Sequence, residues 1–388
     1  MPVDPGLGEF LAGRVSALYA DAELRLLRII RDSLARDLGA PAWAVLKLTE
    51  LERVRAALGA TLRPLTAQAL DLVIETVAEA YEAGQGAAAT ELGAKTAATV
   101  AAPAQARAIA TVAEETISTL IPLRARLLRS AVDVYQRTAA APVAGVLAGA
   151  DTTRTAAQTM LNRLVSQNVL GFTDKSGRRW ALDSYVEMAV RTGTGKAAVQ
   201  GHVDTLAANG LDLVVVSDAP RECPLCRPYE GKVLSTRSGR TGRVTVRSET
   251  SDEPVTVEVT ATLNEARANG FQHPNCRHSL SAYVPGATRL REPRTDPDGY
   301  EAGQRQRAIE RNIRKWKQRE AVALDGPATA IARAKVREHQ AVMRDHLADH
   351  PELRRLRHRE QARGVTHTPA AGPSQAVDAE VRRLLRRS

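Results

Sequence analysis

The sequence predicts a mainly helical protein with a small α+β module at its centre. Apolar residues make up 44% of the 388 residues but aromatic residues only 3%, which favours packed helices over a large sandwich or barrel. Towards both ends of the chain, apolar residues recur at three- and four-residue steps, and only in the middle do they alternate with polar ones. We therefore expect a helical N-terminal region, the central module and a charged helical C-terminal region.

The N-terminal region, residues 1–165, is predicted to be a series of helices. Helical patterns cover about 42–58, 65–82 and 105–147, and an earlier helix ends at the stop signals Gly39 and Pro41. The apolar stripe of that first helix consists of Val15, Leu18, Ala22, Leu26, Ile30, Leu34 and Leu38. This region contains no catalytic motif, so we interpret it as a scaffold.

The central region, residues 166–286, is predicted to combine short strands and short helices. Thr262 and Glu265 form a capping box that opens a short helix, which Gly270 closes. Alternating valines predict a β-hairpin. The other expected elements and the hairpin strands are, in order, a turn at 174–177, a short helix at 182–191, strands at 211–216 and 231–235, and hairpin strands at 243–249 and 255–260.

The C-terminal part carries most of the formal net charge of +10. From Ala287 to Ser388 there are 23 Lys or Arg and 14 Asp or Glu residues. Residues 287–350 predict two charged helices, at about 300–323 and 328–349, and residues 351–388 form a basic tail that is a candidate for disorder. Such a basic region either attracts nucleic acid or an acidic protein surface, or is a solvated helical face.

All three cysteines lie in the central region, in two short motifs. Cys223-Pro-Leu-Cys226 is followed by His273-Pro-Asn-Cys276-Arg-His278. Tetrahedral zinc takes four nitrogen or sulfur ligands, and two such knuckles can supply two each. The candidate ligands are therefore Cys223, Cys226, His273, Cys276 and His278. On spacing we favour His273 as the fourth ligand, because it repeats the two-residue gap, with His278 as the tighter alternative.

Three thiolates and one histidine close a zinc site, which is typical of structural rather than hydrolytic zinc. Two alternatives remain. One is a nuclease of the His-Asn-His type, with His278 as the base and Asn275 orienting it; the other is that the cysteines are merely small buried apolar residues. A zinc deaminase is disfavoured because H-x-E occurs only far downstream, at His350 and His358.

Composition also bears on where the protein acts. No apolar run approaches the ~20 residues needed to cross a bilayer, and the start, Met1-Pro-Val-Asp-Pro5, lacks the basic and apolar segments of a signal peptide. Three grouped cysteines argue against a disulfide framework. We expect a protein without membrane contact, made in a reducing cytoplasm.

With these motifs in view, the chain resembles the minor capsid protein 2 family of tailed phages, and more broadly the head-morphogenesis proteins that act beside the portal. The likeness covers roughly residues 165–325. Its matching stretches are Tyr185 to Arg191, Val215 to Asp218, Cys223 to Cys226, Tyr229 to Val233, Phe271 to Leu280, Tyr283 to Gly286 and Tyr300 to Lys317.

The resemblance implies a non-enzymatic component of the virion capsid, present in the host cytoplasm during assembly. Its partners would be the portal protein and the major capsid or scaffolding protein, and it would help procapsid assembly or DNA packaging. Its N-C-R-H core matches residues 275–278, which strengthens His278 as a zinc ligand. The basic C-terminal region could contact packaged DNA through phosphates alone. The alternative function is a zinc-dependent nuclease or nucleic-acid-processing protein.

Overall fold

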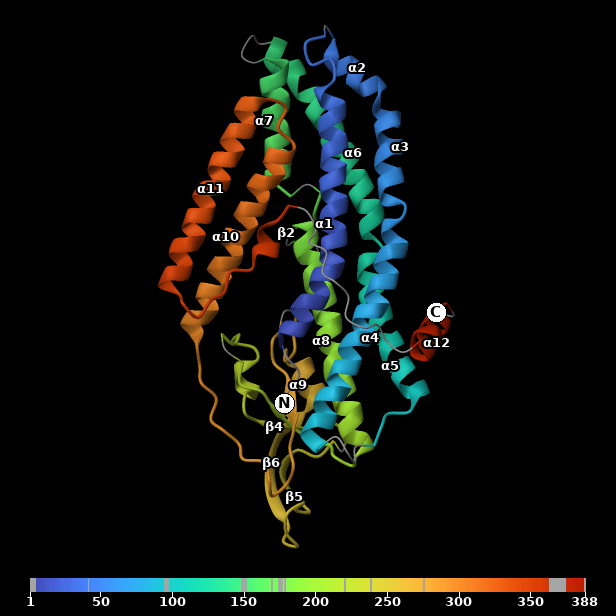
Figure 1. Ribbon diagram of the computed structural model, residues 1–388, viewed down its shortest axis with the longest axis vertical. Coiled ribbons are helices and arrows are strands. Elements are labelled where there is room, and N and C mark those ends of the chain that lie inside the picture. Colours follow the sequence, from blue (N-terminus) through green and yellow to red (C-terminus); the bar gives the residue numbers. More distant parts are fainter. Residues whose placement is uncertain are drawn as a thin grey trace.

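The computed structural model is an elongated helical bundle with a small sheet at one end and a helical pair along one flank (Figure 1). It describes residues 5–40, 42–93, 98–147, 152–168, 170–173, 177, 179–219, 221–237, 239–274, 276–362 and 375–386. The predicted fold class, mainly helical with a small central α+β module, is confirmed.

The bundle is built from long helices that share one apolar core. Its helices are α1 (Pro5–Ala35), α2 (Trp43–Thr49), α3 (Leu51–Leu62), α4 (Leu65–Leu92), α5 (Ala102–Leu120), α6 (Leu123–Leu147), α7 (Thr153–Ser166) and α8 (Leu182–Ala208). The stripe predicted on the first helix faces this core, with Val15, Leu26, Ile30 and Leu34 fully buried. Burial of such a stripe removes apolar surface from water and holds the helix against its neighbours.

Two predicted helices are each divided in the structure. The helix expected at 42–58 is interrupted at Glu50, between α2 and α3. The helix expected at 105–147 is interrupted at Ile121 and Pro122, between α5 and α6. Proline lacks the backbone N–H that a helix interior needs and disfavours helical geometry in the preceding residue, so a break there has a local cause.

Helix α8 is much longer than the segment 182–191 expected from the sequence. The run Thr192-Gly-Thr-Gly195 has low helix propensity, yet the helix continues through it to Ala208 in the middle of the bundle. Glycines in both helices permit close packing: a Cβ at Gly201 of α8 would overlap the carbonyl oxygen of Tyr81 in α4, and one at Gly84 of α4 would overlap the carbonyl oxygen of Ala198 in α8. Tertiary packing therefore overrides the weak helix propensity of glycine.

The central sheet has five strands in the order β5-β6-β4-β3-β7. These are β3 (Leu213–Val216), β4 (Val233–Ser235), β5 (Gly242–Val246), β6 (Val255–Thr262) and β7 (Leu280–Ala282), and all pairs are antiparallel except β4 with β6. The predicted hairpin is confirmed as β5 and β6, which project from the end of the molecule (Figure 1). A second, two-stranded sheet joins β1 (Phe172–Thr173) to β2 (Arg179–Trp180); of the turn expected between them, residues 174–176 lie outside the described residues.

The capping box predicted at the end of β6 is present. Thr262 Oγ1 accepts from the backbone N–H of Glu265, and the Glu265 carboxylate accepts from the N–H of Thr262. This cap opens α9 (Leu263–Ala268), and Gly270 follows it with a φ of 96°. The chain then returns to the sheet as β7, passing the second cysteine motif on the way.

The C-terminal part forms a helical pair on the flank of the bundle. It comprises α10 (Pro297–Ala321) and α11 (Gly326–Asp349), whose shared core includes Ile309, Ile313 and Met343. A 3₁₀ turn, η2 (Arg357–Glu360), returns to α10, and α12 (Gln375–Leu385) packs against α5. Of the tail expected to be partly disordered, residues 363–374 and 387–388 lie outside the described residues.

The four regions expected from the sequence, 1–165, 166–286, 287–350 and 351–388, stay a prediction. The packing adds one fact to it: α8 lies in the second region, but Leu182, Val186 and Val190 belong to the core of the N-terminal bundle. A second apolar cluster is shared by the sheet with α4 and α8, and it contains Cys226 and Phe271. The cysteine motifs therefore lie where the sheet meets the bundle.

Candidate metal centre

Two loops bring the cysteine motifs together. The first follows β3 and runs through Cys223 and Cys226 into η1 (Arg227–Tyr229), and the second follows α9. Each motif closes with the same backbone hydrogen bond: the N–H of Cys226 donates to the carbonyl of Cys223 (3.1 Å), and that of Cys276 donates to the carbonyl of His273 (2.9 Å). This turn places the first and fourth side chains of a motif on one side, which explains the C-x2-C and H-x2-C spacings.

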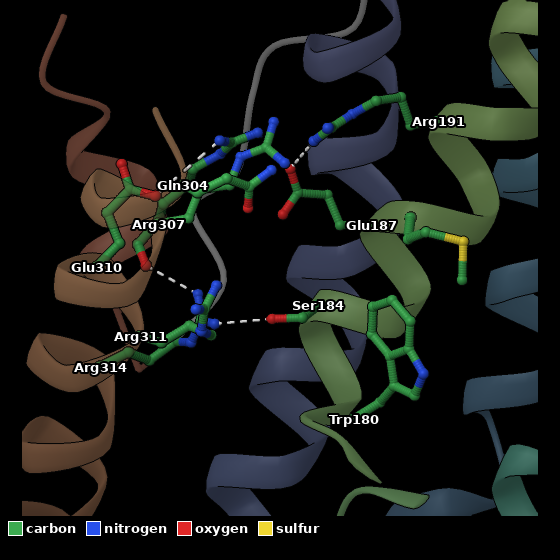
Figure 2. Close-up of a pocket in the computed structure, with 11 residues that line it drawn as sticks. Trp180, Ser184, Glu187, Arg191, Gln304, Arg307, Glu310, Arg311 and Arg314 are labelled. Carbon is green, nitrogen blue, oxygen red and sulfur yellow. Dashed lines mark hydrogen bonds and ion pairs between the residues drawn. The ribbon is translucent and has the colours of Figure 1, made fainter. Parts of the chain in front are cut away.

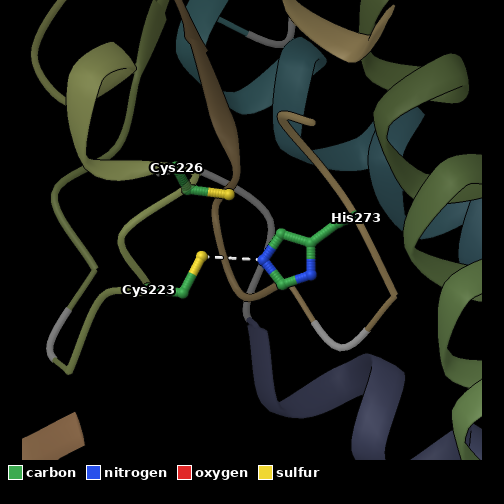
Figure 3. A group of neighbouring side chains, drawn as sticks. All are labelled: Cys223, Cys226 and His273. Atoms are coloured by element: carbon green, nitrogen blue, oxygen red, sulfur yellow. Dashed lines mark hydrogen bonds between the residues drawn. The ribbon is translucent and has the colours of Figure 1, made fainter. Parts of the chain in front are cut away.

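All five predicted ligands are brought together by these turns. Ligand atoms of Cys223, Cys226 and His273 lie within 4.8 Å of one another, as do those of Cys226, Cys276 and His278. Figure 3 shows both thiols of the first motif directed towards the imidazole of His273. The two groups share Cys226, so the sulfur atoms form one continuous donor cluster.

The distances within this cluster differ in how well they suit a tetrahedral ion. Zinc–sulfur bonds of about 2.3 Å and zinc–nitrogen bonds of about 2.0 Å separate two sulfurs by roughly 3.8 Å, and a sulfur and a nitrogen by roughly 3.5 Å. Cys226 Sγ lies 3.5 Å from Cys276 Sγ, and Cys276 Sγ lies 3.4 Å from His278 Nδ1. Cys223 Sγ lies only 2.7 Å from His273 Nε2. The donor set fits zinc, and the spacing around His278 fits it better than the spacing around His273.

A residue that the sequence analysis did not select completes the site. Glu230 Oε1 lies 2.6 Å from Nε2 of His278, and both side chains are almost completely buried. The same oxygen accepts from the N–H of Ala219 at 3.1 Å, which fixes the carboxylate in place. A carboxylate on the far ring nitrogen is the usual outer partner of a metal-binding histidine. In the sequence, the feature that could have pointed to this residue is a glutamate four residues after Cys226 and directly before Gly231.

The second histidine is oriented differently. His273 Nδ1 lies 2.8 Å from the carbonyl oxygen of Pro274, which turns Nε2 towards Cys223. His273 is partly exposed and has no carboxylate partner among the described residues, whereas His278 is 8% exposed. The identity of the fourth ligand, His273 or His278, stays a prediction.

The thiols differ in their readiness to ionise. Burial raises the pKa of Cys223, whereas the hydrogen bond from Cys226 lowers the pKa of Cys276 and outweighs its burial. Burial alone would lower the pKa of His278, but its contacts with Cys226 and Glu230 raise it. Metal binding requires thiolates, so a metal bound at this cluster would release the thiol protons.

The nuclease alternative gains no support from this geometry. A general base needs a ring nitrogen within reach of a water or substrate. In His278, Nε2 contacts the buried Glu230 and Nδ1 faces Cys276. Asn275, which would orient the base, lies outside the described residues.

Comparisons with known proteins agree with the resemblance seen in the motifs. Residues 4–348 match the model of the family described as "Phage minor capsid protein 2". A curated relative, "Structural protein" of Lactococcus phage LL-H, is 27% identical over 194 residues, covering 48% of this chain and 50% of the relative. The chain thus matches about half the length of this relative. No solved structure matches the chain. None of the described helices has the length and apolar character to cross a membrane.

Proposed function

The chain belongs to the phage minor capsid protein 2 family, and from this we propose that it is a minor structural component of the phage head, associated with the portal. The observation that carries the proposal is the family match over residues 4–348, which includes the bundle, the sheet and both helices of the flanking pair. The printed name of the relative, "Structural protein", agrees with it. The protein would be made in the host cytoplasm and end in the virion.

We propose that its partners are the portal protein and the major capsid or scaffolding protein, and that it supports procapsid assembly or DNA packaging. An elongated bundle with a projecting hairpin offers separate surfaces for such contacts (Figure 1). The excess of Lys and Arg after Ala287 supports non-specific contact with packaged DNA, because phosphate contacts need only positive charge.

We further propose that the metal centre binds one zinc ion and that its role is structural. The expected ligands are Cys223, Cys226, Cys276 and His278, with Glu230 orienting the histidine and His273 as the alternative ligand. A bound zinc ion would join the loop after β3 to the loop after α9. Four protein ligands leave no position for a reactive water, so we propose no enzymatic activity.

The test of the head assignment is to look for the protein in the particle. Proheads and mature virions are purified from infected cells and their proteins identified by mass spectrometry, with a host cytoplasmic protein as the control for contamination. We expect the chain in both particles, or at least in proheads. Its absence from both contradicts the proposal. Cross-linking in proheads tests the portal contact separately: cross-links only to other head proteins remove the portal from the proposal and leave the head role intact.

A further inference from the structure

A large arginine-lined cavity lies beside the metal centre. It has a volume of about 700 Å³ and lies between the start of α1, the two cysteine loops, α10 and the segment leading into η2. Five arginines and three glutamates line it, so its wall is positive. Three thiolates and one zinc ion together carry one negative charge, so the wall would stay positive with zinc bound. Its volume is within the range of sites that hold a nucleotide-sized ligand.

The acidic side chains of the wall are already engaged. Glu9 accepts from Arg277 at 2.7 Å and from Arg359 at 3.2 Å. Glu222, with a fully buried side chain, accepts from Arg227 and from the N–H of Asp296. Glu352 is largely exposed and lies 3.4 Å from His350. Among the described residues, these carboxylates form no hydrogen bond or ion pair with the remaining arginines of the wall, although Glu9 attracts Arg307 over a longer distance.

Three arginines of the wall have guanidinium groups that are not hydrogen-bonded or ion-paired within the described part of the chain. Among the described residues, the guanidinium groups of Arg221, Arg307 and Arg354 have no hydrogen bond or ion pair. They come from three separate segments, namely the first cysteine loop, α10 and the segment before η2. The backbone of Arg221 has a φ of 63°, a left-handed conformation that is unfavourable for a residue with a side chain.

Arg307 is the central member of this group. Figure 2 shows it extending from α10, next to Gln304, towards Glu187 and Arg191 of α8, in a smaller pocket that shares Gln304, Arg307 and Arg359 with the large cavity. Glu187 is already paired with Arg359 and Arg191. Burial and then repulsion from Arg359, Arg191 and Arg277 lower the pKa of Arg307 to about 10. A guanidinium ion in this position is stabilised by an anion that brings its own negative charge.

We propose that this cavity binds a phosphate-bearing ligand, with Arg307 as the central contact and Arg221 and Arg354 at the rim. The planar guanidinium fork matches the oxygens of a phosphate in a bidentate manner. Guanidinium groups from three segments favour a ligand with more than one negative charge over a single carboxylate. The phosphate is either that of a free compound or that of a nucleic-acid strand.

The experiment uses the full chain and two probes, inorganic pyrophosphate in calorimetry and a fluorescein-labelled oligothymidylate in anisotropy. We expect saturable binding of pyrophosphate and a loss of affinity of at least about tenfold in Arg307→Gln, since a hydrogen bond to a charged group is removed. The matched control is Arg305→Gln on the same helix, because Arg305 is exposed, does not line the cavity and has no partner among the described residues. Its affinity should stay within about twofold of that of the unmodified chain.

The oligonucleotide identifies the source of the phosphate. If the oligonucleotide binds and pyrophosphate displaces it, the phosphate belongs to a strand; if only pyrophosphate binds, it belongs to a free compound. The proposal is overturned if neither probe binds, if Arg305→Gln weakens binding as much as Arg307→Gln, or if Arg307→Gln binds as well as the unmodified chain. Should Arg307→Gln fail to fold, Arg307→Lys gives the same comparison, because it keeps the charge but loses the fork. The result leaves the head assignment untouched.

Discussion

Glu9 Oε1 lies 2.7 Å from Nη2 of Arg277, the residue that separates Cys276 from His278. The first helix of the bundle therefore contacts the loop after α9, which carries the second cysteine motif. Arg359 of η2 reaches the same oxygen at 3.2 Å, so one carboxylate joins α1, the loop after α9 and the C-terminal part of the chain. Burial alone would raise the pKa of Glu9, but Arg359, Arg277 and Arg191 outweigh it and lower the pKa to about 2.

We expect Glu9→Gln to lower the free energy of unfolding by about 2–4 kcal/mol near neutral pH, because it leaves partly buried arginines without their common partner. The depressed pKa also predicts that the contribution of Glu9 is present above about pH 4.5 and is lost as the pH falls towards 2. Urea denaturation measures both effects. The control is Glu52→Gln, whose ion pair with Arg55 is exposed and should be worth less than about 0.5 kcal/mol. Equal effects of the two substitutions would show that Glu9 does not stabilise the fold as the common partner of these arginines.

Cys226→Ser is expected to release the metal and destabilise the central module, because Cys226 belongs to both donor groups and zinc binding is coupled to folding. Elemental analysis of freshly purified, reduced protein should give one zinc per chain, and none in the variant. Finding no zinc in the unmodified protein would refute the metal proposal. With cobalt in place of zinc, the visible spectrum of the bound cobalt shows which histidine is the fourth ligand. His278→Ala should change this spectrum, and His273→Ala should leave it unchanged. The reverse result makes His273 the fourth ligand.

Glu230→Gln should weaken zinc binding about 10–100-fold, because His278 loses the carboxylate that orients its ring. Competition with a chromogenic chelator measures this affinity. The matched control is Glu222→Gln, which alters an equally buried carboxylate near the same loop that pairs with Arg227 instead. We expect it to lower stability without changing zinc affinity. If both variants retain the affinity of the unmodified chain, Glu230 has no role at the metal.

The contact between α1 and α10 should make stability depend on pH between about 4.5 and 8. Burial, and then the neighbouring Asp183, raise the pKa of Glu23 from 4.5 to about 8, although Arg314 and Gln318 lower it. A raised carboxyl pKa means that the folded state binds the proton more tightly, so stability falls as the pH rises from about 4.5 through 8. Glu23→Gln should therefore be more stable than the unmodified chain at pH 9, by about 2–4 kcal/mol, and similar at pH 5. Parallel unfolding curves at both pH values check this, and an equal difference at the two pH values would contradict it.

The close approach of α4 and α8 predicts opposite effects for two glycines on one helix. Gly84→Ala places a methyl group against the carbonyl of Ala198 and should cost about 3 kcal/mol, since the helices must separate. Gly86→Ala faces open space on the same helix and should gain about 0.5–1 kcal/mol from helix propensity. Thermal unfolding measures both. A Gly84→Ala protein as stable as the unmodified chain would show that the helices are not this close.

Local patterns predicted those features that depend on neighbouring residues. The α1 stripe, the β5–β6 hairpin, the Thr262–Glu265 capping box and the assembly of the cysteine motifs follow from periodicity and spacing, and the structure contains them. The length of α8 was not predicted, because its continuation past Arg191 depends on close packing against α4, which Gly201 permits. Glu230 and the contacts of Glu9 were missed because they join residues far apart in sequence, and a single charged residue carries no periodic signal.

The contact between Glu9 and Arg359 spans almost the whole chain and has a consequence for synthesis. At about 5–20 residues per second, the ribosome needs roughly 20–70 s to add the 350 residues that separate them. During that time the carboxylates of Glu9 and Glu187 lack their pairing with Arg359. The nascent protein can form helices early, but its central charge cluster closes only when translation has passed Arg359. Chains released before that codon would leave the cluster open.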